Sequence, residues 1–143
     1  MMSENHIVRI ENYTIFVDAN YFSNGSTSWG LVAYDQPNSI YISAYRKENI
    51  EIDPLIAEVL GILRGLQTAK NSNWQTVTIM SDAEVVVKCI NSKVYVAAIY
   101  HIVQDCRELL LALQSTNVMF VKCDLNVVAH NLVNLSKLVG CRT

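Results

Sequence analysis

Charged residues are scarce in this sequence. Asp, Glu, Lys and Arg make up 17% of its 143 residues, against 51% hydrophobic residues. Because intrinsically disordered chains show the opposite balance, the composition predicts a folded globular protein. Basic residues are not in excess either, since the formal net charge is -2. A protein dedicated to coating nucleic acid usually carries a basic surface, so the charge argues against that class. It leaves open an enzyme whose site is itself rich in carboxylates.

Signals for disulfide frameworks, zinc sites and membrane spans are also missing. The cysteines form no C-x-x-C pair, and no histidines have the spacing of zinc ligands. The four cysteines are Cys89, Cys106, Cys123 and Cys141. Residues 1–12 are mostly polar, unlike a secretory signal, and the apolar stretches are too short to span a membrane. We therefore expect buried, reduced thiols in an intracellular protein, nuclear or cytoplasmic, with no membrane partner.

Two common types of active site lack their motifs. The sequence has no G-x-x-x-x-G-K-[ST] and no G-x-G-x-x-G, so a nucleotide-binding loop is unsupported. Neither Ser28 nor Ser81 has a His–Asp partnership visible in the sequence, which disfavours a serine hydrolase.

Local patterns predict one domain in the order three strands, helix, strand, two helices, strand, helix. The expected strands are 13–17, 29–34, 40–45, 76–80 and 117–122. The expected helices run from Pro54 to a turn at 71–73, over 83–90, over about 98–113 and over 127–139. A strand meander followed by strand–helix crossovers implies a mixed sheet with helices packed on it. We place a polar lead at 1–12 and the domain at 13–143.

Three acidic residues stand at unusual places in this pattern. Asp18 and Asp82 each end an apolar strand, and strand ends are where sites form in such sheets. Glu58 shares the apolar stripe of its helix, where an acid is unusual unless it is paired or bound to metal. Taken singly, each has a structural explanation. Asp18 can cap a turn, and Asp82 can cap the N-terminus of the following helix. Glu58 can be a negative charge near a helix start, which the helix dipole favours. For Asp82 alone, the N-cap is the favoured interpretation. Together they indicate a cation site, and all-oxygen ligands suit Mg²⁺ or Mn²⁺.

Four segments then carry a family resemblance. They are F-V-D-A-N (16–20), P-L-I-A-E-V-L-G-I-L-R-G-L-Q-T-A (54–69), I-M-S-D-A-E-V-V-V-K-C-I-N (79–91) and N-V-V-A-H-N-L (126–132). In this order they resemble the type 1 ribonuclease H superfamily, most closely its plant branch, as in retroelement-derived, reverse-transcriptase-like proteins.

The resemblance implies a fold, a reaction and a set of ligands. The implied fold is an α/β ribonuclease H-like fold, a five-stranded mixed sheet of order 3-2-1-4-5 flanked by helices. The implied activity is hydrolysis of the RNA strand of RNA–DNA hybrids at a site with two Mg²⁺ or Mn²⁺ ions. Asp18, Glu58 and Asp82 match the first three metal ligands. His130 falls at the fourth position, where many relatives have Asp, and can ligate metal or shuttle protons.

The sequence also departs from the family pattern. Gly61 replaces the second Ala of the Glu motif, and Cys123 replaces an Arg that would contact phosphate. Between 83 and 113 the only basic residues are Lys88, Lys93 and Arg107, too few for a basic substrate-gripping extension. Two hypotheses therefore remain: a metal-dependent endonuclease, or a catalytically weak or inactive derivative that serves as a nucleic-acid-binding or protein-interaction domain.

Overall fold

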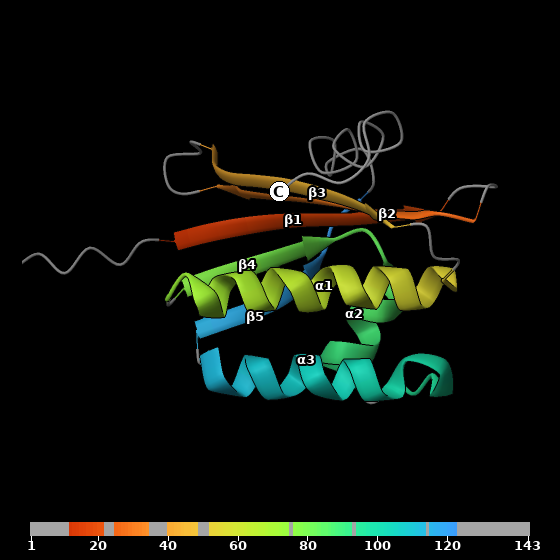
Figure 1. Cartoon of the computed structure of the whole chain (residues 1–143). Helices are drawn as coiled ribbons and strands as arrows, with labels where there is room; N and C mark the ends of the chain where they lie inside the picture. Colours follow the sequence, from red (N-terminus) through yellow and green to blue (C-terminus); the bar gives the residue numbers. More distant parts are fainter. Residues whose placement is uncertain are drawn as a thin grey trace, which may run out of the picture.

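A mixed β-sheet with helices on one side organises the chain in its computed structural model (Figure 1). The structure describes residues 12–21, 25–34, 40–48, 52–74, 76–92, 94–113 and 115–122. The expected final helix at 127–139 lies outside these residues. Among the described helices, none is long and apolar enough to cross a membrane.

The sheet has five strands in the order β3-β2-β1-β4-β5, which confirms the expected topology. They are β1 (Asn12–Tyr21), β2 (Thr27–Tyr34), β3 (Ile40–Glu48), β4 (Thr76–Ser81) and β5 (Ser115–Phe120). The first three strands pair antiparallel as a meander. β4 pairs parallel with both β1 and β5, so the carboxyl ends of these three strands meet at one edge.

Several strand boundaries differ from those expected. β1 continues past Asp18 to Tyr21, and β2 begins at Thr27, inside the stretch expected to be a turn. The reason is tertiary, since ladder pairing runs on from Asp18↔Gly30 to Tyr21↔Thr27 and overrides the local turn propensity. β5 ends at Phe120, two residues before the expected end. Asp18 therefore lies within a strand, where neighbouring backbone fixes its position.

Three α-helices cover the same side of the sheet: α1 (Pro54–Asn71), α2 (Glu84–Asn91) and α3 (Tyr100–Leu113) (Figure 1). A single 3₁₀ turn, Ala97–Ile99, leads into α3. The expected start of α1 is confirmed: Asp53 Oδ1 accepts a hydrogen bond from the Leu55 N–H at 2.9 Å, and Pro54 follows the cap. The first turn of α1 is thus fixed by its own sequence, and Glu58 follows directly at the start of the second turn.

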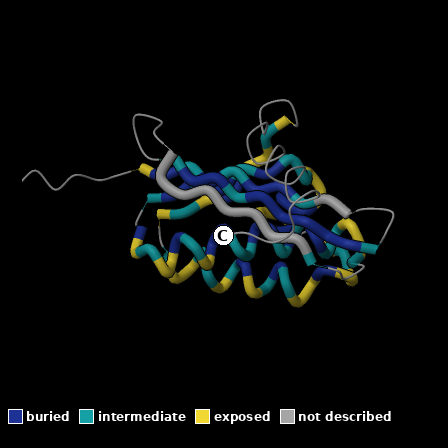
Figure 2. Tube along the Cα trace, turned by 45° about the horizontal axis from the view of Figure 1, so that its top comes forward, coloured by how far each residue is buried: buried dark blue, intermediate teal, exposed yellow. Residues whose placement is uncertain are grey.

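The core lies between α1 and the central strands. Ile62 and Leu66 of α1, with Ile15 and Ile79 of the sheet, are 0% exposed. In Figure 2 the buried positions follow the central strands, and exposed positions recur along the helices. At Gly65 the helix approaches so closely that an added Cβ would lie 3.2 Å from side-chain atoms of both strands β1 and β4. This close packing sets the height of α1 above the sheet, and with it the position of Glu58.

Cys89 and Cys106, on α2 and α3, are buried free thiols as expected. Burial, and secondarily the Asp105 carboxylate, raise the pKa of the Cys106 thiol to about 12. Cys123 and Cys141 lie outside the described residues.

Candidate metal centre

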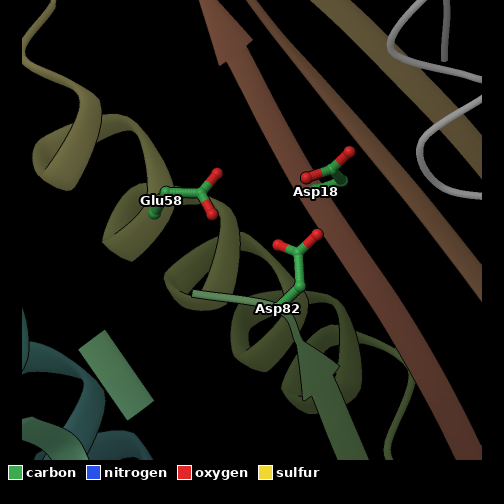
Figure 3. Close-up of side chains that lie close together, drawn as sticks. All are labelled: Asp18, Glu58 and Asp82. Carbon is green, nitrogen blue, oxygen red and sulfur yellow. The ribbon is translucent and has the colours of Figure 1, made fainter. Parts of the chain in front are cut away.

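Asp18, Glu58 and Asp82 converge at the edge where the parallel strands end (Figure 3). The ladder between β1 and β4 pairs Val17 with Ser81, so Asp18 and Asp82 are the next residues along two adjacent strands. Glu58 reaches them from the second turn of α1. One carboxylate oxygen of each side chain lies within 4.8 Å of the other two. Three segments far apart in the sequence therefore meet as predicted.

Asp82 is not the N-cap of α2, so that structural explanation is wrong. The N-cap residue is Ala83, and no side chain caps the helix. The nearby side-chain contact comes from Ser81, whose Oγ accepts a hydrogen bond from the Ala83 N–H at 3.1 Å. The Ser81 hydroxyl thus stabilises the turn before α2. The Asp82 carboxylate is directed toward the other two acids (Figure 3).

The cluster is electrostatically costly without a cation. The pKa of Glu58 rises from 4.5 to about 8, first through desolvation by burial and then through the negative charges of Asp18 and Asp82. A hydrogen bond from the Ala19 backbone N–H acts in the opposite direction and lowers it. Asp18 itself is buried, with 6% of its surface exposed. Near neutral pH, a protonated Glu58 is how the metal-free protein relieves this repulsion.

The donor set fits a hard divalent cation. Mg²⁺ prefers oxygen ligands at about 2.1 Å, so two oxygens bound to one ion lie at most about 4.2 Å apart. The three oxygens, within 4.8 Å of one another, are close enough for small side-chain rotations to bring them onto one ion. A cation also removes the repulsion that raises the pKa of Glu58. Within the described residues, the site therefore offers three carboxylates suited to Mg²⁺ or Mn²⁺.

One contributor to the site has no signal in the sequence motifs. Trp29 on β2 donates a hydrogen bond from its indole Nε1 to the carbonyl oxygen of Ala57, at 2.8 Å. Ala57 directly precedes Glu58. The only sequence signal for this contact is a tryptophan on the strand next to β1. The acceptor of its hydrogen bond on α1 is set by tertiary packing.

The expected fourth ligand, His130, lies outside the described residues, as does Cys123. A role for His130 remains a prediction.

Comparison with known proteins assigns the chain to a family. A family model described as reverse transcriptase-like matches residues 16–136, most of the chain. The chain belongs to the reverse transcriptase-like family of ribonuclease H-like domains. All four candidate site residues, including His130, fall within the matched segment of this reverse transcriptase-like domain. No curated protein matches the sequence significantly.

Solved structures agree on the fold. Ribonuclease H1 from the halophilic archaeon Halobacterium salinarum matches with a TM-score of 0.81 at 17% identity, covering 88% of this chain and 97% of that one. An N-terminal ribonuclease H domain from Mycobacterium tuberculosis gives 0.77 at 19% identity, covering 87% and 92%. LC11 ribonuclease H1, a protein isolated from compost by a metagenomic approach, gives 0.76 at 17%, covering 86% and 94%. The ribonuclease H-like fold is thereby confirmed.

The two described basic residues between 83 and 113 are engaged with protein groups. Arg107 of α3 donates hydrogen bonds to the carbonyls of Cys89, Ile90 and Ser92, where α2 ends. Lys88 lies 3.6 Å from Glu84 on the surface of α2. Lys93 is outside the described residues. The described part of this region therefore offers little free positive charge for a phosphate backbone.

Proposed function

We propose that this reverse transcriptase-like domain is a divalent-metal-dependent endonuclease that hydrolyses the RNA strand of RNA–DNA hybrids. The observation that carries the proposal is the convergence of three carboxylates, from β1, α1 and the end of β4, within 4.8 Å. A cluster this costly is best explained by a cation between its members. The substrate class is supported by one similar structure, LC11 ribonuclease H1, which was solved in complex with an RNA/DNA hybrid.

In this proposal Asp18, Glu58 and Asp82 hold two Mg²⁺ or Mn²⁺ ions, with His130 as a fourth ligand or proton carrier. Bound metal supplies an activated water at neutral pH and stabilises the negative charge on the leaving oxygen. The chain's own part is to hold the oxygens in place on rigid elements. Glu58 must release the proton that its carboxyl retains below about pH 8. Metal affinity should therefore rise with pH up to that value.

The decisive experiment is cleavage of a labelled RNA–DNA hybrid by the purified protein, with Mg²⁺, with Mn²⁺ and with chelator. We expect metal-dependent cutting of the RNA strand that disappears in Asp82→Asn. The matched control is Glu84→Gln, which removes an exposed acid two residues away that takes no part in the cluster. Cutting that survives in Asp82→Asn, or no cutting by folded wild-type protein, contradicts the proposal.

A second candidate is a weak or inactive derivative that binds nucleic acid or protein. The observation that favours it is the engagement of Arg107 and Lys88 with protein groups, which leaves little free positive charge on the described residues between 83 and 113 to grip a hybrid. An electrophoretic mobility assay with the same hybrid measures binding, and the cleavage assay then separates the two functions. Folded protein that binds Mn²⁺ but does not cut favours the derivative, and cutting with normal turnover excludes it.

We also propose that residues 13–143 form one folding unit after a polar lead at 1–12. The family match over 16–136 supports these boundaries. Limited proteolysis that cleaves first inside 13–143 would contradict them.

A further inference from the structure

Trp29 links the backbone segments that carry two of the three acids. In the β1–β2 ladder it pairs with Ala19, the residue after Asp18. Its indole crosses to α1 and donates to the carbonyl of Ala57, the residue before Glu58. The side chain is buried, with 4% of its surface exposed, so it does not contact substrate directly.

The indole is itself held on its outer side. The guanidinium carbon of Arg64 lies 4.2 Å from the centroid of the Trp29 ring, a cation–π contact. Arg64 is fixed in turn by Glu48 of β3, with 3.3 Å between Arg64 Nη2 and Glu48 Oε1. Gly61 lies over the ring on the helix side, where an added Cβ would stand 3.4 Å from Trp29 Cδ1. The ring thus has little freedom to turn away from Ala57.

We propose that Trp29 is a positioning residue of the metal centre: its indole N–H holds the second turn of α1, and hence Glu58, at metal-binding distance from Asp18 and Asp82. The inference rests on the proposed function, because it assumes that the three acids hold a cation. It goes beyond that function by naming a residue outside the acidic motifs that sets the geometry of the ligands.

The physical reason is a balance of forces on α1. When Glu58 is ionised, as metal binding requires, the three carboxylates repel one another, and the repulsion pushes the Glu58 segment away from the strand ends. A buried hydrogen bond between Trp29 and Ala57 opposes that movement at the residue next to the ligand. Without it, bound metal must pull the turn inward, and part of the binding free energy is spent on the rearrangement.

The test compares Mn²⁺ affinity, measured by titration calorimetry, in wild type, Trp29→Phe and Trp74→Phe. Phenylalanine at 29 keeps an aromatic ring beneath Arg64 but removes the N–H donor. Trp74 is a matched control because it is also a buried indole, stacked on Tyr13 at 4.0 Å, but follows the opposite end of α1. Each variant is titrated below the onset of its thermal unfolding, so that lost stability does not enter the comparison.

We expect Trp29→Phe to weaken Mn²⁺ binding about 3- to 10-fold, the effect of losing one buried hydrogen bond. The kcat for the hybrid should fall, with KM unchanged, because Trp29 does not touch the substrate. Trp74→Phe should leave Mn²⁺ affinity within about twofold of wild type, the normal behaviour of a site distant from the change.

Each other outcome has a clear meaning. Unchanged Mn²⁺ affinity in folded Trp29→Phe overturns the positioning role and leaves the proposed function intact. Equal weakening in Trp29→Phe and Trp74→Phe also overturns it, because the effect is then general loosening. Absence of Mn²⁺ binding by wild type overturns the proposed function and this inference together. If Trp29→Phe does not fold, Gly61→Ala added to it supplies helix propensity without restoring the donor, and the same titration decides.

Discussion

Replacing Glu58 with Gln should stabilise the metal-free protein and remove most of the pH dependence of that stability. Gln keeps the size of the side chain but carries no charge, so it ends the repulsion with Asp18 and Asp82. It also ends the cost of burying an ionised carboxyl, which is the larger cause of the raised pKa of Glu58.

The magnitude follows from the pKa of Glu58, about 8 in the folded protein against an ordinary 4.5. Between these values the native carboxyl holds a proton that the unfolded chain has released. The contribution of Glu58 to stability is therefore greatest below about pH 4.5 and is lost as the pH rises through about 8. At about 1.4 kcal/mol per pKa unit the full loss is about 5 kcal/mol, of which about 3 kcal/mol has accrued at about pH 7.

Urea unfolding with chelator at about pH 6 and about pH 9 measures the effect directly. Between these conditions wild type should lose about 2–3 kcal/mol more unfolding free energy than Glu58→Gln. Glu84→Gln is the control, since it removes an exposed acid with a surface ion pair and should change stability by less than about 1 kcal/mol. Saturating Mn²⁺ should stabilise wild type far more than Glu58→Gln. A Glu58→Gln protein less stable than wild type at about pH 9 in chelator would refute the reasoning.

Two further substitutions and one reagent test the packing of the core. Alanine at Gly61 should raise the free energy of unfolding by about 1 kcal/mol, because its Cβ meets Trp29 at an ordinary 3.4 Å and Ala favours helix. Alanine at Gly65 should lower it by about 1 kcal/mol, because its Cβ lies 3.2 Å from two core side chains and overpacking outweighs propensity. Equal melting temperatures for the two variants would contradict both statements. Iodoacetamide should leave Cys106 unmodified in the folded protein and modify it after unfolding, and mass spectrometry can detect the difference. The reason is that a thiol with a pKa near 12 forms almost no thiolate. Fast modification of Cys106 in the folded protein would contradict the burial of this thiol.

The sequence allowed the order of the elements and the positions of the three acids to be predicted because both depend on strong local signals, whereas the sheet order followed from the family resemblance. Asp53-Pro54 starts α1 where expected, and an acid on an apolar helix stripe marked Glu58. Asp18 and Asp82 follow apolar runs, and the parallel pairing of β1 with β4 brings those ends together. Such features survive folding because the hydrophobic period that defines them is also what packs the core.

The N-cap interpretation of Asp82 was wrong because it weighed only the local preference of Asp for helix starts. Ser81, one residue earlier, bonds the Ala83 N–H, and α2 begins after an uncapped Ala83. Similarly, turn-forming residues around 20–28 join a ladder because β1 and β2 continue to pair. In both places, contacts between distant segments decide between alternatives that the local sequence allows.

The same contrast explains why Trp29 could not be predicted. Its partner, the Ala57 carbonyl, is 28 residues away and is a backbone atom, so no side-chain motif records it. The replacement of the family's second Ala by Gly61 had no explanation from helix propensity, which it lowers. The structure places Gly61 over the Trp29 ring, but an added Cβ there makes only an ordinary contact. Gly61 is therefore compatible with the indole without being required by it, and nothing in the structure explains why Ala is absent.

Stability and metal binding make opposing demands on this site. The acids raise the free energy of the metal-free protein, and local packing has to hold them together in spite of that. Three contacts do so on three elements: Ala19 N–H with the Glu58 carboxylate, Trp29 with Ala57, and Ser81 at the turn that carries Asp82. A site preorganised in this way spends little binding free energy on rearrangement, which supports the proposal that a cation binds to the three carboxylates of the described residues. Substitutions that relieve the strain should therefore raise the melting temperature of the metal-free protein and lower its metal affinity in the same variant, whereas substitutions of the supporting contacts should lower both.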